Sequence, residues 1–273
     1  MFSNFTSDRN LCCEIIYTLY CSLEMLSTAS QALASITVIF LAIWTTAMIL
    51  GHIQNNGLNP LNYAVSEYGV VNGSKIYIAI CWWCAAICGT SLCIALAVLF
   101  NNYNVNIDGS IAAVVICLAI YGPARILTWM FPCKLHRPPE IVVGPAAGTA
   151  QPDNPGNINA ENHGFNFSAL FKANQNQQDI NNTLHFLFAI ISFSSVAVAA
   201  CNIGDAGSKL PETSALNRDG PSLTKVGYAI VASLVLSIFL RRRNLFGLGE
   251  RIFYALQMLW FGWTAALTIV DSS

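Results

Sequence analysis

Residues 76–100 read IYIAICWWCAAICGTSLCIALAVLF, and this stretch decides the fold because it contains no charged side chain. A helix that crosses the hydrocarbon core of a bilayer needs about 20 predominantly apolar residues. The stretch is long enough to cross, and Trp82 and Trp83 lie toward its start, as aromatic residues do near a membrane surface. The sequence therefore predicts a membrane-spanning helix at 76–100.

Five further apolar runs have the length, or nearly the length, of a membrane span. They cover residues 32–50, 110–131, 184–201, 223–240 and 252–270. Because only helices and closed barrels satisfy every backbone group within lipid, runs of this length indicate helices. We therefore predict an all-α fold, a polytopic membrane helix bundle of six transmembrane helices.

The overall composition supports an integral membrane protein. Of the 273 residues, 55% are hydrophobic and only 10% are charged, against about 25% charged in soluble domains. So few charges exclude an ordinary soluble enzyme. The formal net charge of −1 also argues against nucleic acid as a partner, since a phosphate-binding face needs an excess of Lys and Arg.

The segments between the runs divide the chain into four parts. Residues 1–30 form an N-terminal tail, in which Glu14 and Glu24 favour an interfacial amphipathic helix over a further span. Residues 31–131 contain the first three spans and residues 184–273 the last three. Between them, residues 132–183 are rich in Pro, Gly, Ala and Asn, which predicts a long flexible polar loop.

Six crossings place the loops 51–75, 132–183 and 241–251 on one side of the membrane, which we call face A. The polar chemistry of the chain is concentrated there. Face A receives the Ser66-Glu67-Tyr68 stretch, Glu250 with Arg251, and all four histidines, namely His52, His136, His163 and His185. A polar site is therefore expected at face A.

Arg125 is the one basic residue inside the third run, about 9 Å from its face A end at 1.5 Å per residue. A charge within the membrane costs roughly 2.5–3.5 kcal/mol and normally finds a partner or extends to the headgroups. Glu67 or Glu250 is a candidate partner. The alternative is an arginine that reaches the interface and only fixes the depth of its helix.

The loop around Ser66 has the composition of a capping or re-entrant segment. Pro60 favours an extended backbone at Asn59, and Ser66 could cap a helix while Glu67 faces Arg251 or Arg125. Such contacts would lock the loop onto the bundle. The candidate polar site consists of Ser66, Glu67, Tyr68, Arg125, His185, Glu250 and Arg251.

Four stretches carry a resemblance to a known family: NPLNYAVSEYGVVNGSKIY at 59–77, RILTWMFPCK at 125–134, TLHFLFAIISF at 183–193 and NLFGLGERIFYALQMLWFGWTAAL at 244–267. In this order and spacing they resemble the membrane family called domain of unknown function 998. The chain differs from the family pattern at Cys133-Lys134 and at Phe186. The resemblance implies a six-span architecture and no settled activity. The architecture is also distantly similar to the DRAM-type autophagy modulators.

The orientation of face A has two opposing indications. Its loops hold eight Lys or Arg residues, and the opposite side holds three, which are Arg9, Lys209 and Arg218. The positive-inside rule therefore favours a cytosolic face A. The family resemblance implies the opposite orientation, so the sequence leaves the compartment open.

Three functions are compatible with the sequence, which carries no recognisable cofactor motif. The first is non-enzymatic binding of a lipid or hydrophobic small molecule, or support of a membrane protein partner. The second is a small-molecule or ion transporter or channel. The third is a metal-dependent lipid hydrolase in which His52, His136 and His185 hold the metal, since three histidines and a water molecule make a sound zinc site.

Overall fold

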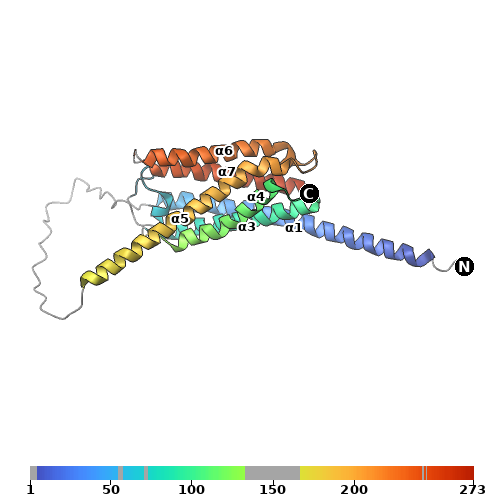
Figure 1. Ribbon diagram of the computed structural model, residues 1–273, viewed down its shortest axis with the longest axis horizontal. Coiled ribbons are helices and arrows are strands. Elements are labelled where there is room, and N and C mark those ends of the chain that lie inside the picture. Colours follow the sequence, from blue (N-terminus) through green and yellow to red (C-terminus); the bar gives the residue numbers. More distant parts are fainter. Residues whose placement is uncertain (1–4, 55–57, 71–72, 133–166, 242, 244) are drawn as a thin grey trace, which may run out of the picture.

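The computed structural model describes residues 5–54, 58–70, 73–132, 167–241, 243 and 245–273, and these residues contain helices and no strand. The helices are α1 (Phe5–Ile53), α2 (Val65–Tyr68), α3 (Lys75–Asn102), α4 (Gly109–Met130), α5 (Phe167–Gly207), α6 (Ala215–Arg241) and α7 (Phe246–Asp271). All but the single turn of α2 are long, and they lie roughly along one axis (Figure 1).

Six of these helices are long and apolar enough to cross a membrane. The candidate spans are Ser27–Ile53, Lys75–Asn102, Gly109–Met130, Asp179–Gly207, Ala215–Arg241 and Phe246–Asp271. Each of them contains one of the six apolar runs, apart from end residues. The prediction of an all-α, six-span membrane bundle is therefore confirmed.

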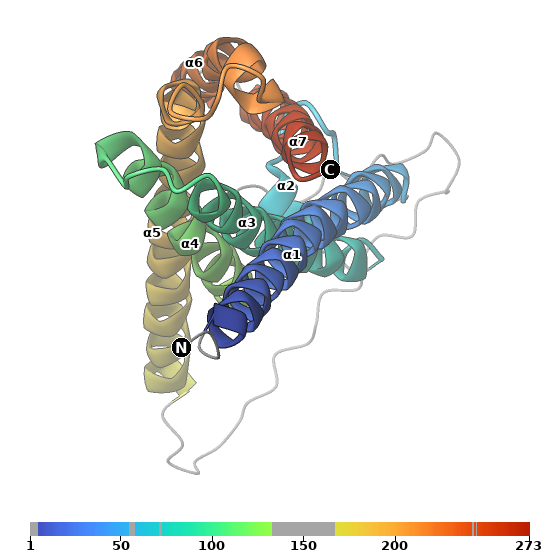
Figure 2. The ribbon, with the colours of Figure 1, turned by 90° about the vertical axis from the view of Figure 1, so that its right-hand side faces the viewer.

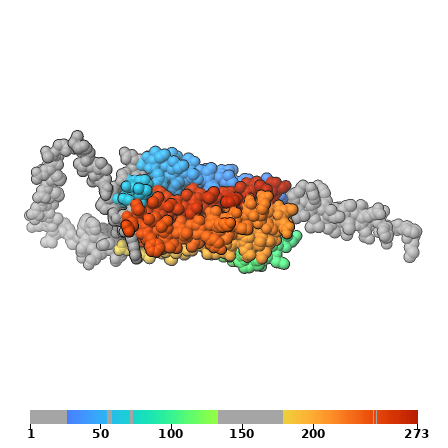
Figure 3. Space-filling view, turned by 90° about the horizontal axis from the view of Figure 1, so that it is seen from above, coloured from blue at the N-terminus to red at the C-terminus, as the bar shows by residue number. Residues whose placement is uncertain are grey.

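The six long helices form a closed ring in which each packs against the next. Around the ring the order is α1, α3, α4, α5, α6 and α7, and α7 returns to α1. Figure 2 shows this arrangement end-on, with α3 near the middle. Because α3 also contacts α7 across the ring, it has the most buried span of the six. Figure 3 shows the packed outer face formed by α1, α6 and α7.

Two helices begin earlier than the apolar runs predict. The backbone of α1 is helical from Phe5 without interruption, since no Gly or Pro falls between residues 5 and 50. The predicted interfacial helix is thus continuous with the first span, and its position in a membrane remains a prediction. Helix α5 begins at Phe167, so the loop is shorter than 132–183. The remaining loop residues, 133–166, lie outside the described part of the chain.

Helices α5 and α6 form a tight hairpin. Helix α6 already begins at Ala215 and contains Pro221. At the crossing, a Cβ atom on Gly220 would lie 3.0 Å from the Cα atom of Gly204. These glycines therefore act as small packing residues that allow two membrane helices to approach closely.

Two aspartates fasten the end of the bundle opposite face A. Asp271, at the end of α7, accepts hydrogen bonds from the backbone N–H groups of Ala215 (2.5 Å) and Leu216 (2.9 Å), which the start of α6 leaves free. Asp108 caps α4 and also forms an ion pair with Lys209, just beyond α5, at 3.3 Å. These contacts join α7 to α6 and α4 to α5.

Candidate functional site

The Ser66 loop is held at face A by two carboxylates that accept backbone hydrogen bonds. Glu67 accepts from the N–H of Ala64 (2.6 Å), and Glu250 of α7 accepts from the N–H of Val65 (2.5 Å). Both glutamates are buried, as is Val65. A buried N–H group without a partner is costly, so these carboxylates make the single turn of α2 possible at this position.

The start of α7 fits against the same loop because it carries glycine. A Cβ atom on Gly247 would overlap the carbonyl oxygen of Tyr63 and would lie 2.7 Å from that of Pro60. Next to it, the N–H of Leu248 donates to the Leu61 carbonyl (3.1 Å). Residues 60–65 therefore pack directly on the first turn of α7.

Arg251 links this loop to α1. Its guanidinium donates to the carbonyl oxygens of Tyr63 (3.0 Å) and Gly247 (2.7 Å) and to Nε2 of His52 (2.6 Å). His52 in turn donates from Nδ1 to the Met48 carbonyl (2.6 Å). Both ring nitrogens of His52 are thus engaged in bonds within the protein.

Tyr68 completes the contacts that fix the Ser66 loop, which we call the locked loop, from the inside of the bundle. Its ring is fully buried, lies 4.7 Å from the His52 ring and has the Arg251 guanidinium carbon 5.4 Å from its centre. Its hydroxyl donates to the Leu58 carbonyl (3.2 Å). Burial raises the pKa of the Tyr68 phenol, so this hydroxyl remains a hydrogen-bond donor at neutral pH.

Arg125 is fully buried in the centre of the bundle among aromatic rings. Its guanidinium carbon lies 3.9 Å from the centre of the Trp82 ring, 5.4 Å from Phe193 and 5.2 Å from Tyr254. One nitrogen donates to the Tyr254 hydroxyl (3.2 Å), while Nε and Nη1 have no hydrogen-bond partner. Within the described residues, no carboxylate forms an ion pair with Arg125.

His185, near the start of the α5 span, closes the end of α4. Its Nδ1 lies 3.0 Å from the Thr128 carbonyl and 2.8 Å from the Phe131 carbonyl. Since both neighbours are acceptors, Nδ1 carries the proton and Nε2 is left as an acceptor. The ring is buried, and it satisfies carbonyl groups that the helix itself cannot.

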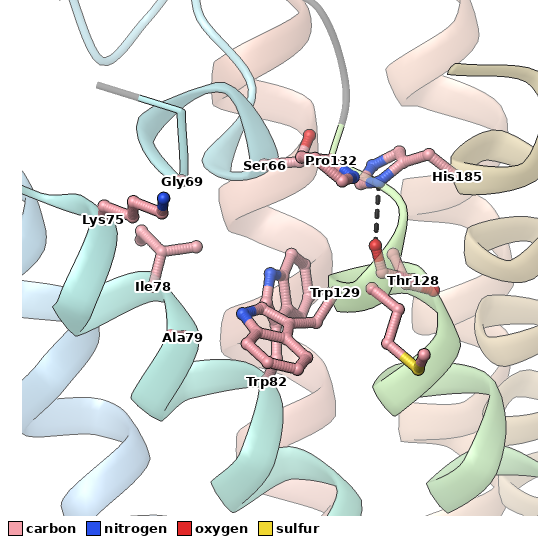
Figure 4. A pocket seen from close by; sticks show the side chains of 11 residues that line it. Ser66, Gly69, Lys75, Ile78, Ala79, Trp82, Thr128, Trp129, Pro132 and His185 are labelled. Atoms are coloured by element: carbon pink, nitrogen blue, oxygen red, sulfur yellow. Dashed lines mark hydrogen bonds between the residues drawn. The ribbon is translucent and has the colours of Figure 1, made fainter. Parts of the chain in front are cut away.

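A pocket of about 400 Å³ lies between α2, α3, α4 and the start of the α5 span. Figure 4 shows the two indole rings of Trp82 and Trp129 near its centre, with His185 on one side and Lys75 on the other. It is lined by Ser66, Gly69, Lys75, Ile78, Ala79, Trp82, Thr128, Trp129, Met130, Pro132 and His185. The pocket is therefore mainly apolar, with a few polar groups at its margin.

The structure brings the predicted site residues to one end of the bundle, but in two groups. Five of them form the locked loop and its support: Ser66, Glu67, Tyr68, Glu250 and Arg251. His185 lines the pocket, and Arg125 lies behind the pocket wall formed by Trp82. Glu67 and Glu250 lie at the same end of the bundle, as the six-crossing topology requires.

The predicted metal set is only partly within the described residues. His136 lies outside them, and the part of the chain that is described contains no group of three or more His, Cys, Asp or Glu side chains that could hold a metal ion. His52 and His185 both use ring nitrogens for bonds to the protein. A metal site therefore remains a prediction from the sequence.

Sequence reasoning did not identify the polar face of α7, although its spacing is visible in the sequence. Glu250, Tyr254, Gln257, Thr264 and Thr268 follow one another at intervals that place them on one side of a helix. All five are buried. Gln257 donates a hydrogen bond to the Tyr121 hydroxyl of α4. This face therefore points into the bundle, toward Arg125.

The chain matches the model of a known protein family. The model of the family described as "Protein of unknown function (DUF998)" matches residues 37–267. The chain belongs to the DUF998 family. No curated protein and no solved structure matches it. The DUF998 match covers the whole candidate site, from the Ser66 loop to Arg251, and the family description assigns no activity to it.

Proposed function

We propose that this DUF998 protein binds a lipid or hydrophobic small molecule in the pocket between α2, α3 and α4, without catalysing a reaction. The observation that carries the proposal is the pocket itself. Its volume of about 400 Å³ lies within the range of small-molecule sites, about 300–1,000 Å³. Its aromatic walls and few polar groups are typical of such sites.

The position of the pocket supports an amphipathic ligand. Trp129, on its wall, is 40% exposed, and its ring lies 5.7 Å from that of Trp83. Partly exposed tryptophans are enriched at the level of the lipid headgroups. A ligand at this depth would place an apolar chain against hydrocarbon and a polar end at face A.

The locked loop supports a binding role over a catalytic one. Glu67 and Glu250 each accept a backbone hydrogen bond in a buried setting. His52 is held by Met48 and Arg251. Groups engaged in this way stabilise the wall of a pocket and are poorly placed to transfer protons.

Filling the pocket tests the proposal. Purified protein would be labelled with a photoreactive, clickable palmitate, and the labelled peptides would be identified by mass spectrometry. We expect labelling of the Trp82 and Trp129 peptides in the wild type, and loss of it in Ala79→Trp, which fills the cavity. The matched control is Ala232→Trp on the exposed surface of α6, which should label like the wild type. Equal labelling of both variants would contradict the proposal.

Transport is the second candidate, favoured by buried polar atoms in the bundle. Arg125, Ser192, Gln257 and Thr264 each have at least one buried polar atom without a hydrogen-bond partner, and polar groups inside a membrane bundle often mark a solvated path. Proteoliposomes loaded with a pH-sensitive dye would measure proton flux under an imposed potential. Flux equal to that of protein-free vesicles, or unchanged in Gln257→Leu, would exclude a proton path through this face.

A further inference from the structure

The charged groups around the pocket are unbalanced. Among the described residues that line the pocket or support its walls, the cations are Lys75, Arg125 and Arg251 and the anions are Glu67 and Glu250. Both anions already accept backbone hydrogen bonds. The described residues of the pocket region therefore carry an excess positive charge, and the part of it on the fully buried Arg125 acts over a longer distance than it would in water.

Arg125 contributes most to this imbalance because it is buried without an ion-pair partner among the described residues. Its Nε and Nη1 atoms have no hydrogen-bond partner, and its guanidinium lies against the Trp82 ring that forms the pocket wall. Cation–π contacts stabilise a guanidinium but do not neutralise its charge. An anion in the pocket would be attracted to Arg125 through the thickness of one indole ring.

Lys75 provides the second cation, at the rim. Figure 4 shows its ammonium group directed toward Gly69 beside the pocket. It forms no ion pair with any described residue. The Ser66 hydroxyl lines the same pocket and can donate a neutral hydrogen bond to an acidic headgroup.

We propose that the pocket selects an anionic amphiphile, a molecule with one apolar chain and a carboxylate or phosphate headgroup near Lys75. This inference rests on the proposed binding function and adds the chemical class of the ligand. The chain would lie against Trp82 and Trp129. The headgroup would lie on the face A side, where Lys75 contacts it directly and Arg125 attracts it from behind Trp82.

The test compares probes that differ only in headgroup. Photoreactive palmitate, the matching alcohol and the matching phosphate monoester would be applied to the full chain in neutral detergent. We expect the two anionic probes to label the pocket peptides at least about tenfold more strongly than the alcohol, the ratio expected from one charge-assisted hydrogen bond. Inorganic phosphate should not compete with them. Competition by inorganic phosphate would overturn the amphiphile in favour of a free anion.

Lys75→Gln should reduce the preference for anionic probes to about threefold or less, while labelling by the alcohol stays unchanged. The control is Lys225→Gln, an exposed lysine of α6, which should keep the preference. Equal labelling by all three probes, or an unchanged preference in Lys75→Gln, overturns the anionic selection and leaves the binding function standing. Failure of every probe to label the pocket overturns the binding function itself.

Discussion

Removing the Glu250 carboxylate should loosen the Ser66 loop and lower the stability of the whole bundle. The side chain is 7% exposed and accepts a 2.5 Å hydrogen bond from Val65, whose own surface is fully buried. A hydrogen bond to a charged group contributes about 1.5–3 kcal/mol, and an orphaned buried N–H costs about 1–3 kcal/mol. The two energies describe the loss of the same hydrogen bond, so they are not added.

A buried charge also carries a desolvation cost, which truncation to alanine relieves. We therefore expect Glu250→Ala to lower the free energy of unfolding by about 2 kcal/mol, at the middle of the hydrogen-bond range. Glu250→Gln keeps an acceptor oxygen and should lose about half as much. With about 2–4 °C per kcal/mol for a chain of this size, the alanine variant should unfold about 4–8 °C below the wild type.

The assay is thermal unfolding in one detergent at one scan rate, followed by tryptophan fluorescence, because membrane proteins often unfold irreversibly. Glu212→Ala, at an exposed position between α5 and α6, is the matched control and should stay within about 0.5 kcal/mol of the wild type. Trypsin should cleave after exposed Lys75 faster in Glu250→Ala. Equal unfolding temperatures for Glu250→Ala and Glu212→Ala would refute the role of this hydrogen bond.

Three further variants test other contacts. Gly247→Ala should lower the unfolding temperature, because its Cβ would overlap the loop carbonyls; a wild-type temperature would contradict that packing. Arg125→Leu should insert normally but unfold at a lower temperature than the wild type, since it loses the Tyr254 hydrogen bond and the aromatic contacts. Normal expression together with a wild-type unfolding temperature would exclude a stabilising role for Arg125. The hydrogen bonds from Ser110 and Ile111 lower the pKa of Asp108 from 3.8 to about 2, so this cap stabilises the fold above about pH 4 and is lost as the pH falls toward 2. The melting difference between the wild type and Asp108→Asn should therefore shrink between about pH 5 and pH 2; a constant difference would argue against the lowered pKa.

The helices could be predicted from hydrophobic length alone, and their ends could not. In lipid the requirement for about 20 apolar residues dominates every other signal, which is why each of the six runs corresponds to a span. The ends depend on contacts that a run does not reveal. Helix α6 begins at Ala215, where Asp271, distant in sequence, accepts its first N–H groups, and the helix continues through the Gly-Pro pair at 220–221.

The site could be predicted as a location, and its individual contacts could not. Topology alone gathers Glu67, Glu250 and Arg251 at face A. The sequence leaves two alternatives for Arg125, a carboxylate partner or an extension to the headgroups, yet its guanidinium is fully buried and contacts the Tyr254 hydroxyl and the Trp82 ring. The reason is the depth of Arg125 in the bundle. The carboxylate of Glu250 accepts the hydrogen bond from Val65 at the loop, one helical turn before Tyr254 along α7. A sequence gives the order of residues on a helix but not which neighbour each one meets.

The locked loop and the pocket are separate parts of the site. Ligand binding can therefore depend on residues of the family motifs that do not themselves contact the ligand. Ser66 and Gly69 belong to the loop and also line the pocket, so any change that moves the loop also moves that wall. Glu250 and Arg251 fix the loop from α7 without lining the pocket. Their substitution should therefore weaken labelling of the pocket by the neutral probe as well as by the anionic ones. Lys75→Gln should instead change only the preference for anionic over neutral probes. This contrast distinguishes the residues that shape the pocket from the residue that interacts with the charge of the ligand.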